Sequence, residues 1–274
     1  SARASRTAST SSRSRRRPAA CISSRISSPG PRRSSAEIRR AFGRWCGAGL
    51  GDPPEGVRRI LRRRARGDHG PRELLRAAAW DLKERRDFDT PWAAAPFERA
   101  AEIDALMAAL AALGAAADSL ESSDFFTKSL VEIRRFVHEV ERREAIGGRD
   151  CDGLEAELLQ LVRATHWRWV GFARGPGAAA KTALRAERQR ALERLLAFVD
   201  AVGADLAPRL QAELRPVIER YQRLKENAGR LDFSDLLFVV RDLLRRDVAV
   251  RRDYQARFSH VLVDEFQDTD PLQA

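Results

Sequence analysis

Near its carboxy-terminal end the chain has an apolar run followed by two adjacent carboxylates, Val261-Leu262-Val263-Asp264-Glu265-Phe266-Gln267-Asp268-Thr269-Asp270-Pro271-Leu272-Gln273. In open α/β sheets, ligands bind beyond the carboxyl ends of the strands, so side chains that meet a nucleotide directly follow an apolar strand. Asp264 and Glu265 occupy that place. An aspartate there can hold Mg²⁺, and its neighbour can deprotonate an attacking water. The run therefore predicts a buried strand over residues 258–263 and half of a nucleotide site.

The same thirteen residues resemble the motif that completes the ATP site in superfamily one helicases of the UvrD/Rep type. Upstream, Tyr221–Lys225 and Leu231–Leu237 resemble the helix and the "LDFxDLL" element that precede this motif, and they favour the RecB/AddA-like branch. Weaker similarity reaches back to residue 38. The resemblance implies ATP and Mg²⁺ as cofactors, and as partners DNA (single strand and duplex junction) and other subunits of a RecBCD/AddAB-like complex.

The resemblance also implies roles for single residues. Asp264 would bind Mg²⁺, Glu265 would act as the general base, Gln267 would link the nucleotide state to neighbouring motifs, and Asp268 would support that loop. The whole protein would couple ATP hydrolysis to translocation along single-stranded DNA and to strand separation, in recombination or double-strand-break repair. A second hypothesis stays open: a non-enzymatic helical module that binds DNA or a partner and retains the motif as a remnant.

The phosphate-binding loop G-x-x-x-x-G-K-[ST] of such an ATP site has no good match. Gly175–Thr182 fits except that Ala180 replaces the second glycine, where a Cβ would intrude on the phosphate. We interpret this stretch as a loop between helices; the alternative, a true phosphate loop, would make Lys181 catalytic. Without that loop and an arginine finger, which alone is worth about 10³ to 10⁵ in rate, we expect negligible ATP turnover by this chain alone.

Composition predicts a mostly α-helical chain. Ala, Leu, Arg and Glu dominate residues 70–250, and these residue types favour helix. We expect a helical insert over residues 38–230, followed over residues 231–274 by an incomplete α/β RecA-like (P-loop NTPase) piece with one buried strand. Asp232 is expected to cap a helix with Asp235 near its third position. Two apolar stripes at helical spacing are expected to be core faces: Ile103, Leu106, Met107, Leu110 and Leu113, and Leu210, Leu214, Val217, Ile218, Tyr221 and Leu224.

Most of the net charge of +11 lies in the first 35 residues, which contain nine arginines and no lysine or acidic residue. Residues 1–37 are Ser/Arg-rich, a composition that predicts disorder because too little apolar surface can be buried. We expect this segment to be a truncated or out-of-frame beginning. The alternative is a basic arm that binds nucleic acid.

A stretch in the middle of the chain interleaves basic and aromatic side chains, as single-strand binding platforms do. Its candidate DNA-binding residues are Arg163, Trp167, Arg168 and Trp169. The alternative is that the tryptophans anchor helix packing and the arginines are solvated.

The three cysteines and four histidines are scattered without metal-ligand spacing, so no zinc site or disulfide framework is predicted. The most apolar stretch, Ala105–Ala117, is shorter than the roughly 20 residues that span a bilayer. We therefore expect a protein without a membrane partner, located in the cytoplasm.

Overall fold

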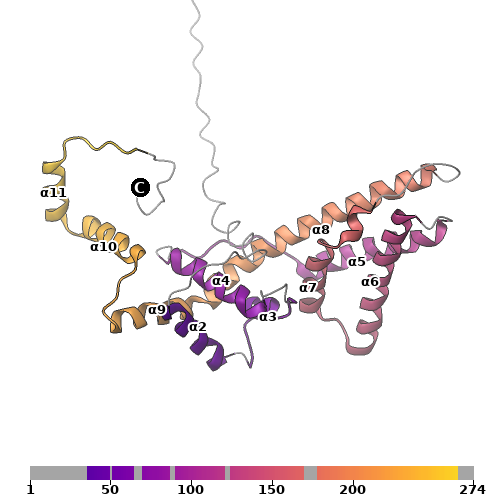
Figure 1. Ribbon diagram of the computed structural model, residues 1–274, viewed down its shortest axis with the longest axis horizontal. Helices are drawn as coiled ribbons and strands as arrows, with labels where there is room; N and C mark the ends of the chain where they lie inside the picture. Colours follow the sequence, from indigo (N-terminus) through magenta and orange to yellow (C-terminus); the bar gives the residue numbers. More distant parts are fainter. Residues whose placement is uncertain are drawn as a thin grey trace, which may run out of the picture. The chain divides into compact units, whose positions relative to one another are not determined.

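A computed structural model describes residues 36–49, 51–64, 70–86, 90–120, 124–169 and 178–264. Of the predicted Ser/Arg-rich segment, only Ala36 and Glu37 lie within these ranges, and both are helical. The chain divides into two compact units. Unit 1 includes residues 49–78 and 91–214, and unit 2 includes residues 33–48, 79–90 and 215–274. The helices are labelled in Figure 1.

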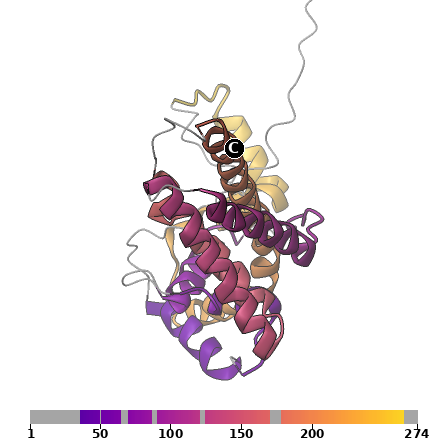
Figure 2. The same cartoon turned by 90° about the vertical axis from the view of Figure 1, so that its right-hand side faces the viewer.

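Unit 1 is built on three long helices. Its elements are α3 (Glu55–Leu61), the first part of α4 (Pro71–Glu84), α5 (Arg99–Ala115), η2 (Ala116–Ser119), α6 (Phe125–Gly147), α7 (Cys151–Leu161), η3 (Thr165–Arg168) and α8 (Ala178–Glu213). Helix α5 packs against both α6 and α8 (Figures 1 and 2). Four members of the predicted stripe on α5 are buried, namely Ile103, Leu106, Leu110 and Leu113, so this core face is confirmed. Met107 is half-buried.

Residues Arg99–Asp118 form the one helical stretch, among those that the structure describes, that is long and apolar enough to cross a membrane. This stretch has 20 residues and is therefore longer than Ala105–Ala117, the apolar stretch identified from the sequence. The core helix of a globular unit passes the same test, and the leucines of α5 are buried in unit 1.

Gly114 allows α5 and α6 to approach closely. A Cβ added at this position would lie 2.8 Å from the Cα of Arg134 on α6, closer than van der Waals contact permits. Gly114→Ala is therefore expected to destabilise the chain by about 1–3 kcal/mol through overpacking, although alanine is the better helix former. Urea unfolding followed by circular dichroism measures this change.

Gly43 in α2 (Ala36–Gly49) provides the matched control, because a Cβ there meets no heavy atom within 4 Å. Gly43→Ala is expected to stabilise the chain by about 0.4–1 kcal/mol through helix propensity and a less flexible unfolded state. Equal effects of the two substitutions would show that α5 and α6 are not in close contact at Gly114.

A remote carboxylate caps α3. The residue before this helix is Pro54, whose side chain provides no cap. Instead, Glu213 at the end of α8 accepts hydrogen bonds from the backbone N–H groups of Gly56 (2.9 Å) and Val57 (2.8 Å). Two of the N–H groups that a helix start leaves without partners are satisfied in this way.

Next to this cap, unit 1 buries a network of charges centred on Arg59, whose side chain is fully buried. Its Nε donates to Glu155 at 2.9 Å, and its Nη1 donates to Asp205 at 2.5 Å. Arg99 lies 3.4 Å from Glu155, and Arg209 lies 3.2 Å from Asp205. Buried charges are tolerated only when they are paired and hydrogen-bonded. Because the paired charges come from α3, α7 and α8, separating these helices would leave buried charges without partners.

Unit 2 contains α2, the last part of α4 from Ala79, α9 (Arg215–Asn227), α10 (Phe233–Arg246) and α11 (Val248–Arg257). The second predicted stripe is buried at Leu210, Leu214, Val217, Ile218 and Tyr221, and Leu224 is half-buried. That stripe is therefore also confirmed as apolar core, although its first two residues belong to unit 1.

The prediction of a buried strand was wrong. The described residues contain no strand, and residues 258–264 follow α11 without regular structure. Val261, Leu262 and Val263 are 75%, 96% and 59% exposed. A strand needs a neighbour to pair its backbone N–H and C=O groups, and no other strand is present in the described ranges. The incomplete α/β RecA-like piece expected over residues 231–274 is therefore not seen, and this region is helical up to Arg257.

Candidate functional site

The segment carrying the carboxylate pair lies at the end of the described chain. Asp264 is its last described residue and is exposed to solvent. Glu265, Gln267 and Asp268 lie outside the described residues, so their roles stay predictions. Mg²⁺ is usually held by one or two carboxylates together with waters and substrate phosphates. An exposed Asp264 fits this requirement, and the described residues contain no group of three metal-ligating side chains.

Helix α10, which precedes this segment, begins with the predicted cap. The side chain of Asp232 accepts from the N–H of Asp235 at 2.9 Å, and the side chain of Asp235 accepts from the N–H of Asp232 at 2.7 Å. This is a reciprocal capping box with aspartate at both positions. The prediction that Asp232 caps a helix together with Asp235 is confirmed.

Three further side chains, those of Arg86, Tyr221 and Lys225, contact the two aspartates of the capping box. We call these five residues the Asp232 cluster. Arg86 donates to Asp232 at 2.7 Å and to Asp235 at 2.5 Å. Lys225 pairs with both carboxylates, and the hydroxyl of Tyr221 donates to Asp232 at 2.5 Å. The cations are nearly inaccessible, with 2% exposure for Arg86 and 7% for Lys225. Both carboxylates are thus occupied in holding the end of α4, α9 and α10 together, a structural role.

The cluster changes the acidities of its members. Burial opposes ionisation of Asp232, but hydrogen bonds from Tyr221 and Arg86 outweigh it and hold its pKa far below the ordinary value of 3.8. For Asp235 burial is likewise outweighed, chiefly by the hydrogen bond from Lys225, and its pKa is also lowered. Burial, together with the hydrogen bond to Asp232, raises the pKa of Tyr221. Both carboxylates are therefore ionised throughout the neutral range.

Lowering the pH should weaken the stabilisation of α10 by the Asp232 cluster. Because the folded-state pKa values of Asp232 and Asp235 lie below 3.8, their contribution to stability is complete above about pH 5 and is lost as the pH falls below 4. Asp232→Asn should destabilise α10 by about 1.5–3 kcal/mol at pH 7 and weaken this pH dependence. Hydrogen–deuterium exchange of the α10 amides between pH 7 and pH 3, corrected for intrinsic exchange rates, measures both effects.

Asp247 offers a matched control, since it caps α11 by accepting from the N–H groups of Ala249 (2.9 Å) and Val250 (3.1 Å). Asparagine is an equally good cap, so Asp247→Asn should leave α10 unchanged. If Asp232→Asn behaves like Asp247→Asn, the cations of the cluster do not stabilise α10.

The basic and aromatic stretch that was predicted to contact DNA follows α7 in unit 1, and its residues differ in how far they are buried. Arg163 and Arg168 are exposed, and Trp169 is half-buried. Trp167 is only 8% exposed, and its indole Nε1 donates to the carbonyl of Leu161 at 2.6 Å. The indole of Trp167 therefore packs inside the unit, while the other three residues have accessible surface.

Lys181, the catalytic residue of the alternative phosphate-loop hypothesis, lies in the first turn of α8. It is 9% exposed, and its Nζ donates to Asp124 at 2.9 Å. Residues 178–182 are helical, so the loop interpretation was wrong for this part, and Gly175–Gly177 lie outside the described residues. A lysine paired with a carboxylate is poorly placed to meet phosphate, which disfavours the phosphate-loop alternative.

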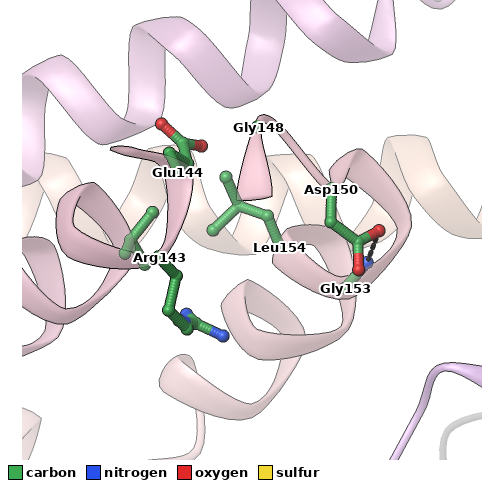
Figure 3. A pocket seen from close by; sticks show the side chains of 7 residues that line it. Arg143, Glu144, Gly148, Asp150, Gly153 and Leu154 are labelled. Atoms are coloured by element: carbon green, nitrogen blue, oxygen red, sulfur yellow. Dashed lines mark hydrogen bonds between the residues drawn. The ribbon is translucent and has the colours of Figure 1, made fainter. Parts of the chain in front are cut away.

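A small pocket lies where α6 ends and α7 begins (Figure 3), and it is lined by Val140, Arg143, Glu144, Gly148, Asp150, Gly153 and Leu154. Its charged side chains already have partners. Arg143 is bound by Glu157 at 2.5 Å, Glu144 lies 3.5 Å from Arg149, and Asp150 accepts from the N–H of Gly153 at 3.0 Å. Arg143 and Asp150 are therefore engaged within the protein, while the buried Oε1 of Glu144 accepts no hydrogen bond and has only the long contact to Arg149.

Residues 176–274 match the UvrD/REP helicase N-terminal domain. The matched region contains α9, the capping box of α10 and the whole carboxylate motif from Asp264 onward. The resemblance to UvrD/Rep-type helicases is therefore confirmed for the carboxy-terminal part of the chain.

Similar helicases match the chain over short segments. DNA helicase II of Haemophilus influenzae is 39% identical over 69 residues, which are 25% of this chain and 10% of that protein. One subunit of the ATP-dependent helicase/nuclease of Pediococcus pentosaceus is 41% identical over 73 residues, and its counterpart from Latilactobacillus sakei is 50% identical over 56 residues. These segments cover 25% and 20% of this chain and 6% of each relative. The chain thus spans 10% or less of the relatives named here. No solved structure matches it significantly.

Sequence reasoning did not find Arg86, the most deeply buried cation of the Asp232 cluster. This arginine lies 146 residues before Asp232, just after the end of α4, in a stretch with no recognisable motif. Lys225 lies in the helix that resembles UvrD/Rep-type helicases, but the sequence predicted no role for it. The only sequence signal was the pair of carboxylates in the capping box, which attract cations in any fold.

Proposed function

We propose that this chain is part of a UvrD-like ATP-dependent DNA helicase that works in DNA recombination and double-strand-break repair. The observation that carries the proposal is the match of residues 176–274 to the helicase domain, which contains the complete carboxylate motif. The names of the similar proteins, DNA helicase II and ATP-dependent helicase/nuclease, support DNA as the substrate and ATP as the energy source. The cytoplasm is the corresponding location.

Within this proposal, residues 38–230 act as a helical insert and residues 231–274 carry the nucleotide motif. Asp264 would hold Mg²⁺, Glu265 would take a proton from the attacking water, and Gln267 and Asp268 would support the motif loop. When bound, the Mg²⁺ ion would neutralise the charge that develops on the transferred phosphoryl group. The Asp232 cluster supports the proposal physically, because it fixes the start of α10, from which the chain leads to Asp264 through α11.

ATP turnover also requires a phosphate-binding loop, and Lys181 does not provide one because Asp124 occupies it. The complete protein, with its other motifs and any partner subunits, is therefore proposed to be the active species. This chain alone should show negligible turnover.

The decisive experiment starts with the gene. The genomic locus is sequenced in all frames on both sides of the coding segment, and the longest continuous product is expressed. Its ATP hydrolysis is then measured with Mg²⁺, with and without single-stranded DNA. DNA-stimulated turnover that depends on Asp264 and Glu265 supports the helicase. A product that binds DNA or a partner without turnover, and in which both substitutions are silent, supports the non-enzymatic module.

A further inference from the structure

The amino-terminal end of α6 displays an aromatic ring that is not used in the core of unit 1. Phe125 is 63% exposed, whereas the adjacent Phe126 is fully buried. The ring of Phe125 stands edge-on to the indole of Trp169, with ring centres 6.3 Å apart and planes at 65°. A pair of accessible aromatic rings brought together from α6 and from the end of η3 is a feature of binding surfaces rather than of a core.

Buried groups hold the Trp169 side of this pair in place. Trp167 is anchored by its hydrogen bond to Leu161, and the ring of His166 lies 5.2 Å from Trp167 and 6.3 Å from Trp169. Arg188 of α8 donates to the backbone carbonyl of Trp169 at 2.8 Å and to the hydroxyl of Ser129 at 2.7 Å. The backbone that carries Trp169 is thus fixed before any ligand arrives, which lowers the entropic cost of binding.

Among the described residues next to the two rings in the chain, the exposed charged side chains are cations. Lys128 is exposed and its Nζ lies 5.4 Å from the centre of the Phe125 ring, while Arg168, beside Trp169, is also exposed. The carboxylate of Asp124, the residue that caps α6, is paired with Lys181 at 2.9 Å. Although partial burial opposes its ionisation, hydrogen bonds from Thr127 and Lys181 lower the pKa of Asp124 to about 2. Glu132, two turns further along, is half-buried.

We infer that Phe125 and Trp169 form a stacking platform for single-stranded DNA, with Lys128 and Arg168 placed to meet its phosphates. Aromatic rings flanked by cations bind unpaired bases of any sequence, because every base has a π-face. A duplex hides its base faces within the stack, so the platform should prefer a single strand. This inference rests on the proposed function for its choice of ligand. It adds Phe125 and Lys128 to the residues predicted to contact DNA. Trp167 is assigned a supporting role, as the buried side chain that helps to hold Trp169 in place.

The test measures binding of the 274-residue chain to a fluorescein-labelled 20-mer of deoxythymidine by fluorescence anisotropy. Phe125→Leu keeps an apolar side chain but removes the ring, and it should weaken binding roughly 5- to 100-fold. Phe125→Trp restores a ring and should bind within about 3-fold of the parent chain. The matched control is Ile146→Ala at the other end of α6, where an apolar side chain that is 85% exposed is removed. It should bind like the parent chain.

The cation is tested in the same way. Lys128→Ala should lower the slope of log Kd against log salt concentration by roughly 0.7, the effect of one lost phosphate contact on a single strand. Arg142→Ala removes the same charge from α6 at an exposed position where Arg142 pairs with Glu139 at 2.6 Å. That variant should keep the parent slope. Circular dichroism confirms that all variants are folded, since each change is at an exposed residue.

A direct contact is detected by photocrosslinking with 5-iododeoxyuridine in the oligonucleotide, which should place the crosslink on Phe125 or Trp169. Three outcomes overturn the platform: no single-strand binding by the parent chain, Phe125→Leu binding as tightly as the parent, or an equal loss for a 20-base-pair duplex. None of these bears on the ATP site, which is tested separately by turnover. Loss of turnover in Glu265→Gln with an unaffected Phe125→Leu would leave the helicase proposal standing without the platform.

Discussion

Replacing Glu265 by glutamine is expected to lower ATP turnover of the complete protein by about 10²- to 10⁴-fold, the usual contribution of a general base. Glutamine keeps the size and a hydrogen-bonding oxygen of glutamate but cannot accept the proton of the attacking water. Binding of ATP should change little, because Asp264 would still hold Mg²⁺. Steady-state phosphate release measures turnover, and equilibrium binding of a fluorescent ATP analogue measures affinity.

Two further variants separate the proton-transfer role from a general effect of charge. Asp270 lies in the same segment but has no assigned role. The Asp270→Asn variant, which loses this acidic group, should therefore hydrolyse ATP at the parent rate. Asp264→Ala should raise the Mg²⁺ concentration needed for half-maximal turnover. If Glu265→Gln keeps the parent rate, Glu265 is not the general base and the non-enzymatic module gains support.

Replacing Arg59 by methionine should produce the largest loss of stability, about 3–5 kcal/mol, because one partner of a buried ion network is removed. Glu155 is 1% exposed and Asp205 is 5% exposed, so both carboxylates would stay buried with incomplete compensation. Urea unfolding monitored by circular dichroism gives the free energy.

The neighbouring Arg58 is the matched control. Its side chain is 49% exposed and pairs with Asp152 at 2.6 Å, so Arg58→Met should have a much smaller effect. Combining Arg59→Met with Glu155→Gln should recover part of the stability, because the double variant no longer buries the carboxylate of Glu155 without its arginine. Additive losses in this double variant would contradict the view that uncompensated charge causes the destabilisation.

Predictions made from local sequence patterns were the successful ones. The stripes on α5 and from Leu210 to Tyr221 are buried, and the capping box at Asp232 and Asp235 is formed. Each depends on residues within a few turns of one helix, where spacing alone determines which side chains share a face. The strand over residues 258–263 was wrong because a strand is not local. An apolar run becomes a strand only when another strand satisfies its backbone.

For the candidate sites, too, the local features were predicted from the sequence and the features that depend on packing were not. The carboxylate motif and its likeness to UvrD/Rep-type helicases are read from thirteen consecutive residues, and the family match confirms the likeness. The aromatic and basic stretch around Trp167 was visible in the sequence, but its division into a buried anchor and accessible rings was not. Burial depends on which helices pack over a segment, and periodicity within a four-residue turn such as η3 does not reveal that.

The mostly helical character, the two apolar faces, the cap of α10 and the helicase motif could be predicted from sequence, since each is encoded by residues close together in the chain. The partners of the charged and aromatic side chains, in contrast, depend on how the helices pack. Arg86 meets Asp232 across 146 residues, Arg59 joins Glu155 to Asp205, and Phe125 meets Trp169. Arginines and carboxylates are numerous in this chain and any could pair with any other. The packing of helices brings particular ones within reach, and burial makes those pairs obligatory.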